Sequence, residues 1–209
     1  MKITSLRKYK GTTYETEIDG GRKIYLHIDI ITDYALREGM EIDRDTLRRV
    51  IYASNFRRAY QYALYRLDYR DYSAEEMYQK LLETYKSEKL CLAVIEKLAR
   101  AGLIDDKRFA GNLARKLVEV KRYGFYRAKR EITMKGIDQQ TAETALAQYS
   151  DTFQENLREL LATRYSSGLS DSSDRKAIEK VKNALVRYGY SFTEVNSAVK
   201  EYFEEQTEE

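Results

Sequence analysis

The segments that decide the fold lie in the middle of the chain: LIDDKRFA at Leu103–Ala110, RYGFYRAKR at Arg122–Arg130 and MKGID at Met134–Asp138. The first contains two aspartates, and an aspartate side chain caps a helix by accepting hydrogen bonds from its free N–H groups. Asp105 or Asp106 is therefore predicted to start a helix. The second segment indicates a basic turn into another helix, and the third indicates a glycine stop before one more helix.

Apolar residues in and around these segments recur at the spacing of an α-helix. One face of the first helix is predicted to consist of Phe109, Leu113, Leu117 and Val120. Gly124 opens the next turn, and Ala128 and Ile132, four residues apart, face the core from the second helix. Gly136 suits the left-handed position that ends a helix, and Asp138 is predicted to cap the third helix.

The composition favours helices over sheets. The 209 residues include no proline and no tryptophan but 19 tyrosines, and 34% are charged. Such a chain is typical of many helices joined by short polar turns. A mean hydropathy of −0.68 predicts thin modules with much surface instead of one large core. The net charge is only +3, so local charge matters more than the total.

The expected cellular compartment is inferred from three features that the sequence lacks. No apolar run approaches the ~20 residues of a membrane span. The first residues, MKITSLR, show neither the apolar stretch nor the cleavage site of a signal peptide. A single cysteine excludes an internal disulfide. We expect a cytoplasmic protein with no membrane partner.

The one β-like region covers residues 2–30 and predicts a two-stranded hairpin. Gly20 and Gly21 form a tight-turn pair between extended runs. The second strand is predicted from the alternation of Ile24, Leu26, Ile28 and Ile30. Thr32 is then expected to cap a short helix ending at Gly39. Asp43 starts a longer one, with a break expected around Ser54-Asn55.

An internal repeat is the main architectural signal. Tyr85-Lys-Ser87, Gly136-Ile-Asp138 and Gly189-Tyr-Ser191 each stand between a helix end and a cap, 51 and 53 residues apart. Each repeat is interpreted as three helices, and such units stack into elongated arrays. The first has Tyr85 where the others have glycine, so its helix is expected to end without the left-handed turn.

Several local features of the repeats are also predicted. Ser73-Ala-Glu-Glu76 is a capping box that opens the second helix of the first repeat, and Ser87 opens the third. In that third helix the predicted buried residues are Cys91, Val94, Ile95 and Leu98. In the last repeat they include Phe153, Leu157, Leu161, Ile178, Val181, Leu185, Phe192, Val195, Val199 and Tyr202. A flexible loop is expected at Ser166–Ser173, and a frayed acidic tail at Glu204–Glu209.

The same central motifs resemble a known family. GLIDDKRFA, YGxxxAKREI and KGID, in this order, resemble the RecX family of bacterial RecA regulators. The resemblance continues upstream through Ala63-Leu64, RDYS at Arg70–Ser73 and EMYQKL at Glu76–Leu81. It covers roughly residues 55–150 well and extends more loosely to residue 205. It implies a non-enzymatic protein that lies along the groove of the RecA–DNA filament and limits its activities.

Catalysis finds little support. His27 is the only histidine and lies on a predicted strand, where a solvent-facing or hydrogen-bonding role is the simpler interpretation. Cys91 falls on an apolar helix face, typical of a buried and unreactive thiol. One histidine and one cysteine cannot build a Cys/His zinc cluster. Gly20-Gly21 lacks the Gly-Lys-Ser/Thr of a phosphate loop. We therefore predict no catalytic residues, no cofactor and no metal.

Binding finds more support in the central patch, a run of basic and aromatic residues. Between Arg115 and Lys135 eight basic residues face two acidic ones, a local excess of +6. The predicted partner-binding or DNA-binding residues are Arg115, Lys116, Lys121, Arg122, Tyr123, Phe125, Tyr126, Arg127, Lys129, Arg130 and Lys135. The alternative is a solvated helix face with its aromatics packed inward. A second basic run is interpreted as solvated surface: Arg44, Arg48, Arg49, Arg57 and Arg58.

These patterns predict a mostly α protein, an elongated tandem array of three three-helix repeats after a small N-terminal β-hairpin and helix. The expected divisions are 1–54 for the N-terminal segment, then repeats at 55–104, 105–150 and 151–209. The resemblance implies a monomer that binds RecA and the RecA–DNA filament. It would modulate recombinase, ATPase and coprotease activities in recombination, repair and the SOS response, most simply by inhibition. The alternatives are a single-stranded-DNA-binding module that uses the central patch and a structural adaptor.

Overall fold

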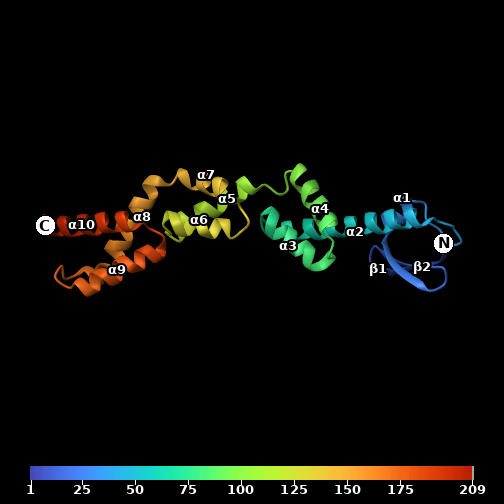
Figure 1. Cartoon of the computed structure of the whole chain (residues 1–209), viewed down its shortest axis with the longest axis horizontal. Helices are drawn as coiled ribbons and strands as arrows, with labels where there is room; N and C mark the ends of the chain where they lie inside the picture. The colour runs from blue at the N-terminus through green and yellow to red at the C-terminus, as the bar shows by residue number, and fades with distance from the viewer. Residues whose placement is uncertain (209) are drawn as a thin grey trace. The chain divides into compact units, whose positions relative to one another are not determined.

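The computed structural model describes residues 1–208, and the architecture is mostly α-helical with one small sheet, as predicted (Figure 1). By its internal contacts the chain divides into two compact units, one of residues 1–104 and one from Asp105 on. The first holds the sheet and helices α1 to α4. The second holds helices α5 to α10 in two successive groups of three. The elongated shape and the exact repeat boundaries stay predictions.

The N-terminal sheet has three strands among the described residues, where the sequence suggested two. Strands β1 (Ile3–Lys10), β2 (Thr13–Ile18) and β3 (Arg22–His27) pair antiparallel in the order β1-β2-β3. Asp19 and Gly20 make the turn between β2 and β3 with φ of 52° and 73°. The strand absent from the predicted hairpin is β1, which contributes the fully buried Ile3 to the core.

The strand ends sooner than its alternating pattern predicted. Helix α1 (Ile28–Asp33) begins directly after β3, because His27 Nδ1 accepts a hydrogen bond from the Asp29 N–H and caps the helix. Thr32 lies inside α1 and is not its cap, and α1 ends before Gly39. The isoleucines of α1 fit a helical period as well as an alternating one, so periodicity alone misassigned them.

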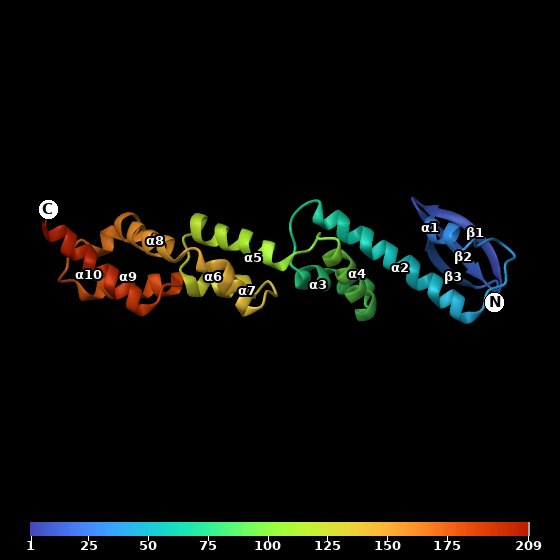
Figure 2. The ribbon, with the colours of Figure 1, turned by 90° about the horizontal axis from the view of Figure 1, so that it is seen from above.

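Helix α2 (Arg44–Leu67) connects two separate hydrophobic cores of the first unit (Figure 2). Asp43 caps it as predicted, accepting from the N–H groups two and three residues on. The predicted break at Ser54-Asn55 is wrong, because α2 is continuous there. Ser54 is buried and its hydroxyl accepts a hydrogen bond of 2.9 Å from the His27 N–H. A polar residue at this helix position therefore joins α2 to the sheet.

Helices α3 (Ala74–Tyr85) and α4 (Glu88–Arg100) complete the first unit. Ser73 caps α3 through the Glu76 N–H, as the capping box predicted. The expectation that α3 ends without a left-handed turn is wrong, because Lys86 adopts φ 51°. The left-handed residue stands one position after Tyr85. In α4, Cys91 is fully buried among apolar side chains, and burial raises its thiol pKa.

His27 makes the stability of the first unit depend on pH. Its side chain is almost completely buried, and Nε2 has no hydrogen-bond partner among the described residues. Burial lowers the His27 pKa, an effect opposed by Asp29 and aided by Arg57 and Arg58. The unfolded chain therefore binds a proton below about pH 6.5 that the folded chain rejects. Stability should fall from pH 7 to pH 5, by at most about 1.4 kcal/mol per pH unit.

His27→Asn tests this dependence, since its side-chain oxygen still caps α1 but does not titrate. Urea unfolding at several pH values should show a slope in the parent protein that flattens in the variant. A parent whose stability is constant from pH 7 to pH 5 would contradict the assignment.

The second unit begins with α5 (Asp106–Arg115), which continues into a π-helical turn, η1 (Lys116–Val120). Asp105 caps α5 through the N–H groups of Lys107 and Arg108, as predicted. The π turn inserts extra residues into the helical register. Leu117 and Val118 are buried in consequence, while Val120 is 75% exposed, so its predicted place in the core is wrong.

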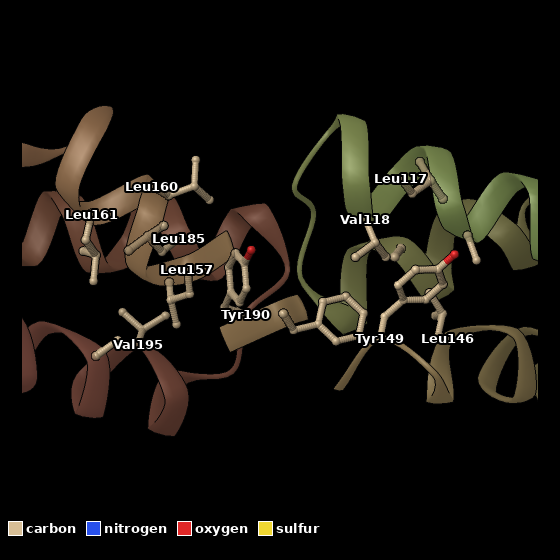
Figure 3. Close-up of a cluster of buried hydrophobic side chains, with 14 of the residues drawn as sticks. Leu117, Val118, Leu146, Tyr149, Leu157, Leu160, Leu161, Leu185, Tyr190 and Val195 are labelled. Carbon is tan, nitrogen blue, oxygen red and sulfur yellow. The ribbon is translucent and has the colours of Figure 1, made fainter. Parts of the chain in front are cut away.

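Five further helices and a short 3₁₀ turn follow, and most predicted positions are confirmed. Their bounds are α6 (Phe125–Thr133), α7 (Gln139–Ala147), α8 (Ser150–Thr163), η2 (Ser166–Leu169), α9 (Arg175–Tyr188) and α10 (Phe192–Glu208). Ala128 and Ile132 are fully buried, Gly136 has φ 80° and Asp138 caps α7. The core of this unit is drawn in Figure 3.

Three predictions for the last repeat need correction. The loop expected at Ser166–Ser173 begins with the 3₁₀ turn η2, whose Leu169 is fully buried and anchors it. Phe192 is 63% exposed, because it is the first residue of α10 and lies outside the core. The acidic tail is helical through Glu208. Residue 209 lies outside the described residues.

Candidate binding surface

The central patch lies where the two helical groups of the second unit join, and the joint depends on two glycines. The Gly124 N–H donates to the Tyr188 carbonyl, and the Tyr126 N–H donates to the Gly189 carbonyl, both at 3.0 Å. A Cβ on Gly124 would lie 2.5 Å from the Gly189 oxygen. The two backbones therefore approach closely only because neither residue has a side chain.

Two of the three aromatic side chains of the patch, Tyr123 and Phe125, pack on this joint. The rings of Tyr123 and Tyr188 meet edge to face at 5.3 Å, and Phe125 meets Phe153 at 6.2 Å. The Arg127 guanidinium lies 3.9 Å from the Tyr123 ring centre. For these residues the inward-packed interpretation is the better one.

Intramolecular ion pairs neutralise three cations of the patch. Arg122 pairs with Glu159 of α8 at 2.5 Å, and Lys129 pairs with Glu143 of α7 at 2.5 Å. Arg127 lies 3.9 Å from Glu131, one turn further along α6. The net positive charge of the folded patch is therefore lower than the +6 counted along the sequence. Two of the three pairing acids, Glu159 and Glu143, come from outside the patch.

The rest of the patch faces solvent. Its exposed members are Arg115, Lys116, Lys121, Tyr126 and Arg130, while Lys135 is half-buried. None of those four exposed cations forms a salt bridge with a residue that the structure describes. On α6, Tyr126 and Arg130 are one turn apart and are followed by Met134, which is 72% exposed. This side of α6 combines an aromatic ring, a cation and an apolar chain.

A pocket beside the patch gathers cations from both helical groups. It has a volume of about 260 Å³, and the walls include Lys121 and Arg122 near η1 and Arg164 and Tyr188 near α8 and α9. The Arg164 guanidinium donates to the Tyr188 hydroxyl at 2.8 Å, which fixes its position. Arg122 is paired with Glu159, so the two remaining cations, Lys121 and Arg164, are the groups that could bind a phosphate or carboxylate. Glu119 also lines the pocket and lowers its net positive charge.

The sequence analysis missed Arg164 and Tyr188, which lie about 30 and 50 residues beyond the patch. Nothing local marks either residue as part of this site. The one sequence feature that could have pointed to these residues is the pair of glycines before helices, Gly124 and Gly189. Their close approach brings α9 beside the patch. Tyr190 supports the same joint, since its hydroxyl donates to the Arg122 carbonyl at 2.9 Å.

The described residues contain no group of three or more His, Cys, Asp or Glu side chains placed to hold a metal ion. His27 and Cys91 are buried in different cores of the first unit. No helix in the described part of the chain is long and apolar enough to cross a membrane.

Comparison with known proteins identifies the family. A model described as RecX, second three-helix domain, matches residues 105–146. The crystal structure of RecX from Lactobacillus salivarius is 31% identical, with a TM-score of 0.62, over 71% of this chain and 97% of that one. The chain belongs to the RecX family. A second crystal structure, of a regulatory protein RecX, shares the fold with a TM-score of 0.73 at 22% identity, over 96% of this chain and 98% of that one.

Two relatives named regulatory protein RecX are longer than this chain. The regulatory protein RecX of Geobacillus kaustophilus is 29% identical over 174 residues, 82% of this chain but just under two thirds, 65%, of the relative. That of Streptococcus sanguinis is 26% identical over the whole of this chain and 80% of the relative. By these names the family is one of regulatory proteins.

Proposed function

We propose that this RecX-family chain binds RecA and the RecA–DNA filament and limits the filament's recombinase, ATPase and coprotease activities. Family membership supports the regulatory role. The observation that supports this surface is the set of exposed cations without salt bridges beside Tyr126. Exposed cations that form no salt bridge within the chain remain available to a partner. The filament offers two kinds of anionic group, phosphates and acidic side chains.

The proposal narrows the central patch to the residues that face solvent. Arg115, Lys116, Lys121 and Arg130 would contact the filament, together with Tyr126 as an aromatic anchor. Arg122, Tyr123, Phe125, Arg127 and Lys129 would instead hold the joint that positions them. The pocket that Lys121 and Arg164 line would accept one anionic group of the partner.

A second function is favoured by that pocket, namely direct binding of single-stranded DNA. A protein held mainly by phosphates loses affinity with salt, with a slope near −0.7 per neutralised phosphate. Engagement of about five phosphates would cost roughly a hundredfold in affinity between 50 and 200 mM salt. A RecA-coated strand would add apolar and aromatic contacts that salt screens much less.

Fluorescence anisotropy of the labelled chain, titrated with bare and RecA-coated oligonucleotide at several salt concentrations, distinguishes the two functions. We expect weak and steeply salt-dependent binding to bare DNA, and tighter binding with a flatter slope to coated DNA. Equal affinity and equal slope for both would reject the RecA proposal and leave the DNA-binding module. Inhibition of the DNA-dependent ATPase of RecA provides an independent readout.

A further inference from the structure

One side of the middle of helix α2 is only partly covered between the two cores of the first unit. Its first half packs through Leu47 and Val50 on the sheet, and its second half packs through Ala59 and Ala63 on α3 and α4. Between them an aromatic row continues along one side of the helix at intervals of four residues: Tyr52, Phe56 and Tyr60. The rings are stacked, with centres 6.3 and 6.5 Å apart.

This row forms one wall of a groove in the first unit. The groove has a volume of about 550 Å³ and runs along α2 from Tyr52 to Leu64. Ile30 of α1 and Lys97 of α4 line it from the flanking elements. Most of the surface of the groove is apolar. Tyr52, at one end of it, is 40% exposed to solvent. At 1.5 Å per residue the groove is about 18 Å long, the length of roughly three helical turns.

The polar residues at the groove set its charge. The Lys97 ammonium lies 4.4 Å from the centre of the Tyr60 ring and 5.5 Å from that of Phe56. It has no salt bridge with any described residue. Arg57 also lines the groove and is already paired with Asp29. One uncompensated cation therefore stands at the edge of an apolar groove.

We propose that this groove binds an amphipathic helix of a partner protein, with apolar anchors and an acidic flank. Anchors spaced at i, i+4 and i+7 would lie over the aromatic row, as in other helix-in-groove complexes. A Glu or Asp on the flank would pair with Lys97. The inference rests on the first unit alone and is independent of the function proposed for the central patch.

Charge distinguishes this partner from a nucleic acid, because a strand 18 Å long would bring several phosphates. The groove offers Lys97 and an arginine that is already paired, too few cations to neutralise them. Its aliphatic walls, Ile30 and Leu64, also suit aliphatic anchors better than the faces of bases. The observations therefore favour an acidic helix over single-stranded DNA.

The test uses two labelled synthetic helices of fourteen residues, each with leucine or phenylalanine at three anchor positions. One carries glutamates on the flank, the other lysines at the same positions. Anisotropy with the full chain should show the acidic helix binding at least about tenfold more tightly. Lys97→Glu should reverse this preference, which a simple loss of folding would not do. Tyr52→Ala should weaken both helices, because it removes an exposed anchor surface.

Arg100→Glu is the matched control. Arg100 is exposed on α4, the helix that also carries Lys97, and it pairs with Glu96. It does not line the groove, so Arg100→Glu should still bind the acidic helix more tightly than the basic one. Equal affinity for the two helices, or no binding of either, would overturn the proposal. So would binding of a labelled oligothymidylate that Tyr52→Ala and Lys97→Glu both abolish, since the groove would then stack bases.

Discussion

Gly189→Ala is expected to destabilise the second unit by about 3–5 kcal/mol. Two costs add at this position. Gly189 has φ 103°, where a side chain is strained. A Cβ there would also lie 2.5 Å from the Arg127 backbone nitrogen and 2.8 Å from the Gly124 carbonyl oxygen. Backbone atoms cannot rotate away as a flexible side chain would, so the joint between the two helical groups must open.

Two other glycines separate these costs. Gly124→Ala introduces the steric overlap alone, because φ at Gly124 is an ordinary −70°, and it should cost about 2–3 kcal/mol. Gly39→Ala introduces the strain alone, because φ is 81° but no heavy atom lies within 4 Å of the new Cβ. It should cost about 1–2 kcal/mol and act on the first unit.

Hydrogen exchange resolved by peptide, combined with denaturant unfolding, would measure these differences unit by unit. Amides of α6, α9 and α10 should lose protection in Gly189→Ala and Gly124→Ala, while those of α3 and α4 should not. An unchanged unfolding midpoint for Gly189→Ala, or equal effects of Gly189→Ala and Gly39→Ala, would mean that the joint is not packed as described.

Helix positions in the second unit were largely predictable because their signals are local. Asp105 and Asp138 cap helices through N–H groups two or three residues away, and a short stretch of sequence contains both partners. The same holds for Ser73 and Glu76. Where a helix start depends on one side chain and its own first turn, residue type and spacing are enough.

Predictions failed where a distant contact overrides a local preference. Ser54 suggested a helix break, but its hydroxyl accepts from the His27 N–H, 27 residues earlier in the chain, and α2 continues. Val120 had the correct helical spacing for the core, but the π turn shifts the register and turns it outward. Neither the hydrogen bond of Ser54 nor the π turn at η1 can be inferred from the residue types around it.

The candidate site shows the same limit. The sequence located the central patch, but a count of charges along the chain could not separate binding cations from structural ones. Arg122 and Lys129 pair with Glu159 and Glu143, which come from other helices. Only the fold brings these acids to the patch, and only the fold adds Arg164. The exposed cations of the patch that form no salt bridge with a described residue are therefore the ones to replace in a functional test.

Removal of the exposed positive charges should abolish most binding to anionic partners while the fold remains intact. The variant replaces four cations with glutamine: Arg115, Lys116, Lys121 and Arg130. None has a salt bridge with a described residue and none is buried, so the unfolding midpoint should change little. If each contacts one phosphate, the salt slope on bare single strands should flatten by about 2.8. Affinity at 100 mM salt should then fall roughly 100- to 1,000-fold.

A charge-matched control in the same unit separates local contacts from net charge. It replaces four exposed cations of α9 with glutamine: Arg175, Lys176, Lys180 and Arg187. Both variants lose the same total charge, so long-range attraction weakens equally in each. Only the first loses the side chains beside Tyr126 and at the Lys121–Arg164 pocket.

The comparison is made by anisotropy on bare and RecA-coated DNA, with inhibition of the RecA ATPase as the functional readout. We expect the control to stay within about threefold of the parent. The patch variant should lose at least tenfold on coated DNA and should inhibit correspondingly less. Aromatic and apolar contacts survive in that variant, so its loss on coated DNA should be smaller than on bare DNA. Equal losses of affinity in the two variants would mean that the central patch acts only through its net charge. Full inhibition of the RecA ATPase by the patch variant would mean that the patch is solvated surface and does not bind the filament.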